Sequence, residues 1–407
     1  MSGHDANACQ GAVHGFSVEF RFPVYFTRGI WNSANTLFRD TVSAPEPRRR
    51  HRVFIAIDDA VAAAHPRLIA DIQQYFAVHG DVLGLATEPV RVPGGETAKN
   101  ELAHLFALLA DLNNAAMDRH SYVVAIGGGA VLDVVSLAAA LAHRGIRTVR
   151  LPTTVLAQAD SGIAVKNSVN LFGKKNFAGT FVPPFAVIND GTYLDTLPPR
   201  ERIAGLAEVV KVALLRDAVL FAQLELEAAA LVTGERDALT HAVRRSAELH
   251  LGHICGNGDP FELGSARPLD FGHWAAHKLE MMTGHRINHG EAVAIGMALD
   301  TRYAARVGLL DDLTAERILR LLEALGFRLW DPALLQPSAD GGLTLLEGLR
   351  EFREHLGGEL HVTLLRGIGH SLEVSSIDQT LMLEAVGDLA GRAVSASQPR
   401  RAGAPAV

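Results

Sequence analysis

Cysteine is almost absent from this chain of 407 residues, which carries only two, Cys9 and Cys255. Two cysteines cannot build a disulfide framework or a cysteine-ligated zinc site, and so few fit the reducing cytoplasm. Positively charged residues are also outnumbered, because the chain has 38 lysines and arginines but 45 aspartates and glutamates. A formal net charge of −7 gives no general attraction to nucleic acids or anionic lipids, so we expect neither as a partner.

Long apolar runs are missing as well. The longest, such as residues 134–142, fall far short of the roughly 20 residues that a membrane helix needs. Residues 1–15 lack the basic region and apolar core of a secretion signal. With 48% hydrophobic and 20% charged residues, the chain can bury one or two ordinary cores. We therefore expect a soluble, cytoplasmic protein of two globular domains.

The order of local patterns divides the chain into an α/β part and a helical part. Short β-rich runs alternate with amphipathic stretches up to about residue 198, which is typical of a parallel, doubly wound sheet. Helix-period segments dominate afterwards, so the sequence predicts a Rossmann-like α/β domain over 1–198 and a mostly α-helical domain over 199–390. The predicted strands are 53–57, 123–126, 148–151 and 185–189, and the predicted helices include 201–215, 218–231 and 313–325.

Three segments depart from the helical pattern of the second half. Residues 256–268 hold two prolines and several glycines and predict a site loop, whereas 360–365 predict a late strand. The tail 391–407 is too small and polar to pack, so we expect it to be disordered.

A run of three glycines, Gly127–Gly129, follows a predicted buried strand and precedes a helical segment. Glycine lets backbone amides approach a pyrophosphate, and a helix N-terminus favours negative charge. The turn therefore fits a dinucleotide site, although it lacks the GxGxxG pattern and an ordinary tight turn is the alternative. Upstream, Glu96 and Lys99 offer a carboxylate for ribose hydroxyls and an ammonium, with a solvated turn as the alternative.

Polar residues crowd the otherwise apolar segment 159–176, which contains Asp160, Lys166, Lys175 and Asn176. Ammonium groups hold phosphate, and aspartate or asparagine orients hydroxyls, so the cluster predicts a site for a phosphorylated polyol. An exposed polar surface is the alternative interpretation.

Glu208, His273 and His289 form a candidate metal site. Two imidazoles and one carboxylate leave open positions on a zinc-like ion, as catalytic sites require. His277 follows His273 by four residues and shares its helical face. With 18 histidines in the chain, an accidental spacing is the alternative.

Taken together, these segments resemble the 3-dehydroquinate synthase superfamily of sugar-phosphate cyclases over roughly residues 50 to 385. The resemblance rests on the order and spacing of short motifs. It implies a two-domain fold, NAD, a catalytic Zn²⁺ or Co²⁺, a small sugar-phosphate substrate and a homodimer. The matching motifs are Gly127–Gly129 with Asp133, Pro152–Thr154, Asp160 with Lys166, Lys175–Asn176, Thr196–Pro198, Gly205–Glu208, His273 and His289.

The resemblance also assigns roles to individual residues. The metal would be held by Glu208, His273 and His289. The NAD site would be lined by Asp58, Glu96, Lys99, Gly128, Gly129, Asp133, Thr153, Thr154, Lys175 and Thr196. The substrate would face Asp160, Lys166, Asn176, Lys211, Arg267, Asp270 and His277.

Some positions depart from dehydroquinate synthases in ways that bear on the substrate. Asp270 is similar in position to a neutral amide of dehydroquinate synthases. His250 and His355 are similar in position to lysines of those enzymes. Losing lysines and gaining a carboxylate disfavours an acidic substrate, so a neutral ketose phosphate fits better. These features resemble the branch that cyclises sedoheptulose 7-phosphate, and His277 favours its 2-epi-valiolone group. Arg144 still matches an arginine that contacts the substrate carboxylate, which keeps dehydroquinate synthesis as an alternative.

The resemblance implies transient oxidation by NAD, phosphate elimination, reduction and an intramolecular aldol closure to a valiolone-type cyclitol. NAD then leaves the cycle unchanged. A metal- and NAD-dependent polyol dehydrogenase, which would produce net NADH, is a further alternative. The third alternative is an inactive, ligand-binding relative.

Overall fold

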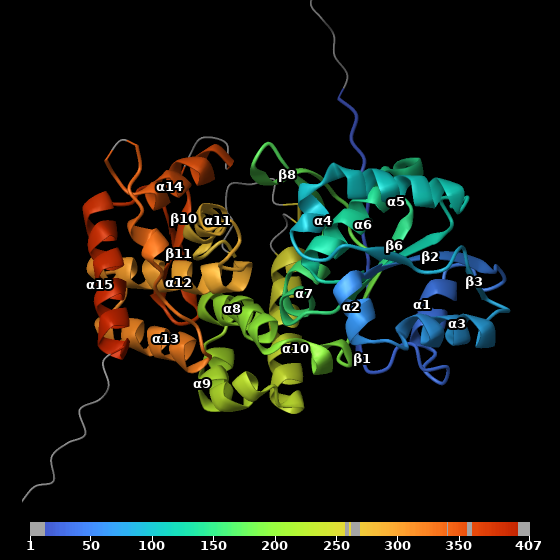
Figure 1. Ribbon diagram of the computed structural model, residues 1–407, viewed down its shortest axis with the longest axis horizontal. Helices are drawn as coiled ribbons and strands as arrows, with labels where there is room; N and C mark the ends of the chain where they lie inside the picture. Colours follow the sequence, from blue (N-terminus) through green and yellow to red (C-terminus); the bar gives the residue numbers. More distant parts are fainter. Residues whose placement is uncertain (1–12, 257–259, 262–268, 340, 356–359, 398–407) are drawn as a thin grey trace, which may run out of the picture.

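The computed structural model describes residues 13–256, 260–261, 269–339, 341–355 and 360–397 (Figure 1). Its α/β half is built on seven parallel strands, most of them in the order β1-β9-β6-β5-β2-β3, with β4 also pairing with β2. The four predicted strands are confirmed as β2, β5, β6 and β9. The strands are β1 (Val24–Thr27), β2 (His51–Asp58), β3 (Leu83–Leu85), β4 (Val90–Val92), β5 (Tyr122–Gly127), β6 (Arg147–Pro152) and β9 (Ala186–Asp190).

Helices cover both faces of this sheet, which confirms the doubly wound arrangement (Figure 1). The central strands are buried on both sides, and this explains their nearly continuous apolar sequence. One face packs against α1 (Leu37–Ser43) and α3 (Leu68–Val78), and the other against α5 (Leu102–Asn114) and α6 (Gly129–Leu141). Short helices α2 (Asp59–Ala64) and α4 (Thr97–Asn100) begin near the carboxyl ends of β2 and β4.

A β-hairpin outside the main sheet carries part of the predicted polar cluster. Strands β7 (Lys166–Leu171) and β8 (Lys174–Phe181) pair antiparallel, and β7 packs against α6. A short helix α7 (Val155–Ala159) and a 3-10 turn η2 (Ser161–Ile163) connect β6 to this hairpin. The sequence pattern did not predict the hairpin, because its polar side chains obscure any alternation.

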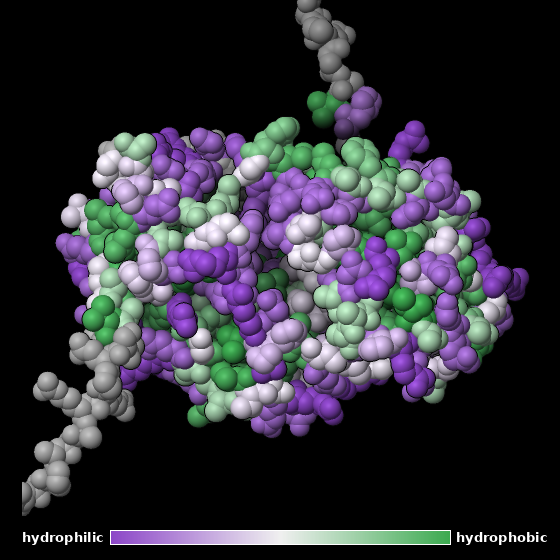
Figure 2. Space-filling view, viewed as in Figure 1, coloured by the Kyte–Doolittle hydropathy of each residue, from purple (hydrophilic) through white to green (hydrophobic). Residues whose placement is uncertain are grey.

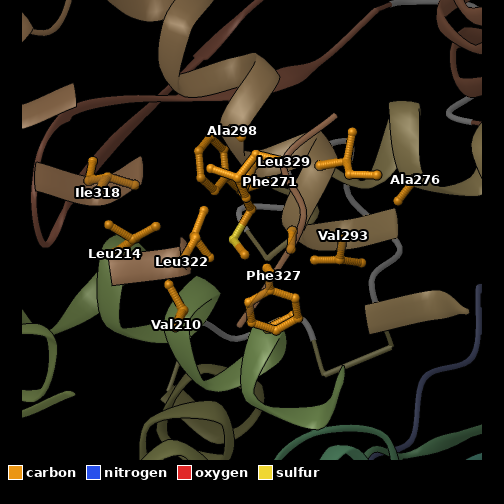
Figure 3. Packing of buried hydrophobic residues seen from close by; sticks show 14 of the residues in the cluster. Val210, Leu214, Phe271, Ala276, Val293, Ala298, Ile318, Leu322, Phe327 and Leu329 are labelled. Carbon is orange, nitrogen blue, oxygen red and sulfur yellow. The ribbon is translucent and has the colours of Figure 1, made fainter. Parts of the chain in front are cut away.

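The second half is mainly helical, as predicted, and its core is shown in Figure 3. Val210 and Leu214 of α8 pack there with Val293 of α12 and with Ile318 and Leu322 of α13. The helices are α8 (Pro199–Arg216), α9 (Ala218–Thr233), α10 (Arg236–Gly256), α11 (His273–Met282), α12 (His289–Arg306), α13 (Asp312–Ala324), α14 (Thr344–His355) and α15 (Gln379–Ser397).

The end of the chain differs from the sequence prediction. The late strand is present as β10 (Val362–Gly367), but it belongs to a hairpin with β11 (His370–Val374). The prediction of a disordered tail from residue 391 is wrong for 391–397, because these residues continue α15. Arg392 supplies the reason, since it pairs with Glu316 and Glu323 of α13. Among the described residues, we find no helix long and apolar enough to cross a membrane.

Candidate active site

The three predicted metal ligands come together from three helices. Glu208 lies in the middle of α8, while His273 and His289 are the first residues of α11 and α12. Their ligand atoms all lie within 4.8 Å of one another. Glu208 Oε1 is 3.5 Å from His273 Nε2 and 3.3 Å from His289 Nε2.

The other ring nitrogen of each histidine is already engaged. His273 Nδ1 lies 3.1 Å from the carbonyl oxygen of Phe271, and His289 Nδ1 lies 3.1 Å from Glu280 Oε2. Each Nδ1–H can therefore donate to an acceptor, which leaves each Nε2, the atom nearer Glu208, available to bind a metal. Such a set fits a zinc-like cation with open positions. Sequence reasoning missed Glu280, although it stands seven residues after His273 on the same helix.

Charges around this set favour a bound cation. Burial alone would lower the pKa of His289, but Glu280 and Glu208 outweigh it and raise the pKa to about 9. Burial would raise the pKa of Glu208, but Lys211 and His273 hold it well below its usual range. The imidazole of His289 therefore keeps a proton at neutral pH wherever a metal does not replace it.

We predict that the metal affinity of the metal-free protein rises with pH up to about 9. Below that pH the metal must displace the proton of His289, which weakens binding about tenfold per unit of pH. Competition with a fluorescent zinc chelator over a pH series measures this slope. A flat profile would show that His289 is not a ligand.

Close helix packing sets the ligand spacing. A Cβ atom on Gly290 would lie 1.9 Å from the carbonyl oxygen of Ala204, and one on Gly296 would lie 2.0 Å from that of Gly272. Only glycine allows α12 to approach α8 and the start of α11 this closely. These contacts bring His289 to the other two predicted ligands.

A second cluster extends from the ligands toward the α/β half. Lys211, one turn after Glu208 on α8, contacts that carboxylate and lies with its Nζ 3.2 Å from Asp160 Oδ2. Asp160 Oδ1 is in turn 3.4 Å from His250 Nδ1 on α10. The negative charge of Asp270 acts on Lys211, and the positive charge of Lys166 acts on His250.

Within this second cluster, Lys211 is charged at neutral pH whereas His250 is neutral. Burial would lower the pKa of Lys211, but Asp160 and Glu208 outweigh it and raise the pKa, so the ammonium stays charged. Burial lowers the pKa of His250 below its usual value despite Asp160, so this imidazole is neutral at neutral pH. Burial and the nearby His273 hold the pKa of His277 well below its usual range.

A polar network forms beside the glycine turn. Lys99 Nζ donates to Asp133 Oδ2 at 2.6 Å, to Ser168 Oγ at 3.1 Å and to the side-chain oxygen of Asn176. Asn176, predicted to face the substrate, therefore contacts residues of the predicted NAD site. Ser168 was missed, because a lone serine in a short strand carries no sequence signal.

Lys175 links the nucleotide side to the metal side. Its Nζ lies 2.7 Å from Glu280 Oε1 and 3.3 Å from Glu96 Oε1. Since Glu280 also orients His289, one ammonium connects a predicted NAD residue with a predicted metal ligand.

The glycine turn itself fits a pyrophosphate. Gly128 precedes the first turn of α6, which begins at Gly129. Two buried hydroxyls nearby, Thr153 Oγ1 and Ser161 Oγ, have no hydrogen-bond partner among the described residues. A Cβ on Gly129 would lie 2.7 Å from Ser161 Oγ, so any side chain there would fill the space.

The remaining predicted NAD residues follow strand ends at the same edge of the sheet. Asp58 ends β2 and accepts from the amide of Ala60 at the start of α2. Thr154, after β6, caps α7, and Thr196, after β9, lies 2.8 Å from His65 Nε2 through its Oγ1. Parallel strands place ligand-binding residues at their carboxyl edge.

For three other residues named from the sequence, the described structure gives no contact with this site. Arg267 lies outside the described residues, as do most of the predicted loop 256–268 and the side chain of His355. Arg144 lies in a 3-10 turn after α6, whose 13 residues carry the chain about 20 Å from the glycine turn. Within one chain, Arg144 is therefore at the opposite edge of the sheet.

The sequence of this chain is similar to that of a known enzyme family. Residues 89–204 match the family model of the 3-dehydroquinate synthase N-terminal domain, and 205–340 match that of its C-terminal domain. A 2-epi-5-epi-valiolone synthase of Streptomyces glaucescens is 38% identical over 288 residues, covering 70% of this chain and 72% of the relative. A 3-dehydroquinate synthase of Xylella fastidiosa is 39% identical over 294 residues, covering 71% and 77%.

Solved structures show the same fold. ValA, a 2-epi-5-epi-valiolone synthase of Streptomyces hygroscopicus with NAD⁺ and Zn²⁺ bound, superposes with a TM-score of 0.82 at 30% identity, over 94% of this chain and 100% of that chain. A 2-deoxy-scyllo-inosose synthase with NAD⁺ and Co²⁺ gives 0.72 at 24% identity, over 90% and 96%. An iron-containing alcohol dehydrogenase gives 0.59 at 15% identity, over 92% and 99%.

Proposed function

Because the chain belongs to the 3-dehydroquinate synthase family of sugar-phosphate cyclases, we propose that it converts sedoheptulose 7-phosphate to a valiolone-type C7 cyclitol with release of phosphate. Its reaction class is that of the family, an NAD-dependent carbon–oxygen lyase. The product we expect is 2-epi-valiolone or an epimer. We also propose that the protein is a cytoplasmic homodimer.

The observation that carries the substrate choice is the neutral His250 beside Asp160. An acidic heptulosonate phosphate brings an extra carboxylate, which a permanent positive charge would stabilise. His250 supplies none at neutral pH, and Asp270 adds a negative charge near Lys211. A neutral ketose phosphate therefore fits this cluster better.

Two groups complete the proposed enzyme, and the residues present fit both. NAD would bind at the glycine turn, where the hydroxyls of Thr153 and Ser161 have no partner in the described part of the chain. A Zn²⁺ or Co²⁺ ion would bind between Glu208, His273 and His289, whose Nε2 atoms face the carboxylate. When bound, NAD would accept and return a hydride and the metal would polarise a substrate oxygen.

The chain's own side chains mainly position the substrate and balance its charge. Lys211 lies between Glu208 and Asp160, so its Nζ would donate to a substrate oxygen beside the ligand set. Asp160 would accept from a ring hydroxyl, and Lys166 would hold the phosphate. We assign proton abstraction to an oxygen of the leaving phosphate, so these residues act by orientation and charge stabilisation.

The proposal is tested by following phosphate release and NADH absorbance together. We expect purified protein with zinc and NAD to release phosphate from sedoheptulose 7-phosphate without net NADH, and to release little from 3-deoxy-arabino-heptulosonate 7-phosphate. Mass and NMR analysis of the product then defines the epimer. Faster turnover of the acidic substrate would assign the chain to dehydroquinate synthesis, and stoichiometric NADH would assign it to polyol oxidation.

A further inference from the structure

Arg150, in the middle of β6, is a buried charge without an assigned role. Only 1% of the residue is exposed, and its guanidinium forms no salt bridge with any residue that the structure describes. Burial lowers its pKa to about 10, with Asp133 opposing the effect, so it remains charged at neutral pH. A buried charge is costly unless hydrogen bonds satisfy it, so the partners of this guanidinium indicate its purpose.

The guanidinium binds one short segment of backbone. Its Nη1 donates to the carbonyl oxygens of Ala164 at 2.6 Å and Gly162 at 3.4 Å, and its Nη2 donates to that of Lys166 at 3.2 Å. Its Nε donates to Ser136 Oγ on α6 at 3.0 Å. These carbonyls come from alternate residues, so one planar fork spans the connection between η2 and β7.

This connection joins two residues that we place at the substrate. Asp160 stands at its beginning, in contact with Lys211 and His250, and Lys166 stands at its end. Between them, the local backbone bonds form a short 3-10 turn, in which the amide of Ile163 donates to the carbonyl of Asp160 at 3.1 Å and that of Ala164 donates to the carbonyl of Ser161 at 3.4 Å. The fork from Arg150 therefore ties the connection to the rigid sheet and to α6.

We propose that Arg150 is a positioning residue that fixes the separation of Asp160 and Lys166 and thereby sets the affinity for the sugar phosphate. The inference rests on the proposed function, because that function places both residues at the substrate. Arginine is required here in preference to lysine, since a single ammonium cannot reach three spaced carbonyls and a hydroxyl in one plane.

The test compares Arg150→Met and Arg150→Lys with the matched control Arg147→Met. Arg147 lies at the amino end of the same strand and bonds Glu46 and Tyr122, away from the connection. Hydrogen exchange is measured on peptides covering 160–166 in the protein without substrate. We expect faster exchange there in Arg150→Met, an intermediate rate in Arg150→Lys and the wild-type rate in Arg147→Met.

Binding measurements separate positioning from general damage. We expect the KM for sedoheptulose 7-phosphate in Arg150→Met to rise about tenfold or more, while NAD affinity and zinc content stay as in the wild type. Wild-type exchange and KM in Arg150→Met would overturn the inference, as would equal behaviour of Arg150→Lys and wild type. If the wild type releases no phosphate from sedoheptulose 7-phosphate, the proposed function fails, whereas the exchange data still judge Arg150.

Discussion

Replacing His273 with alanine is expected to remove stoichiometric zinc from the protein and to lower turnover by about 10²- to 10⁴-fold. The imidazole is one of three converging groups that we predict to be metal ligands, and its Nδ1 is fixed by the carbonyl of Phe271 so that Nε2 faces Glu208. Lewis-acid stabilisation by a catalytic metal contributes several kcal/mol, and each 1.4 kcal/mol corresponds to about a factor of ten in rate. Chelation of the wild type should have the same effect, and added Zn²⁺ or Co²⁺ should reverse it.

Metal analysis, phosphate release and circular dichroism measure the result. His241→Ala is the matched control, because this exposed histidine of α10 is not among the ligands. We expect both variants to remain folded, since a large hydrophobic core surrounds the site. Unfolding of His273→Ala would indicate a structural histidine, and full activity of metal-free wild type would exclude a catalytic metal.

Replacing His250 with lysine and Asp270 with asparagine together is expected to shift selectivity toward the acidic heptulosonate phosphate. The double change removes a negative charge acting on Lys211 and adds a permanent positive charge next to Asp160. A charge about 4 to 6 Å from a carboxylate changes its energy by about 1 to 4 kcal/mol, which is a factor of about ten to a thousand in affinity.

The ratio of kcat/KM for the two heptulose phosphates measures this shift. His250→Gln is the control, because it changes the side chain without adding charge, and we expect its ratio to stay near that of the wild type. An unchanged ratio in the double variant would show that neither residue faces the substrate carboxylate, and the substrate choice would then rest on other residues.

The main strands were predictable because each is a local apolar run between turn residues. β5 is buried along its whole length, so its sequence is apolar throughout and was assigned correctly. β1 has only four residues, all of them half-buried, and only its parallel pairing with β9 reveals it. The ordered end of α15 was missed for a similar reason, since Arg392 is stabilised by residues about 70 to 76 positions earlier.

By itself, the sequence predicted the nucleotide turn and the metal set, because Gly127–Gly129, Glu208, His273 and His289 occur in an order and spacing that resemble those of one enzyme family. Only the tertiary structure decided which residues support them. Glu280, Ser168 and Arg150 act through partners on other elements, so no local pattern marks them. The close approach of α12 to α8 likewise depends on the contact between Gly290 and the carbonyl of Ala204. These residues are far apart in the sequence, so only the packing of the folded chain brings them together.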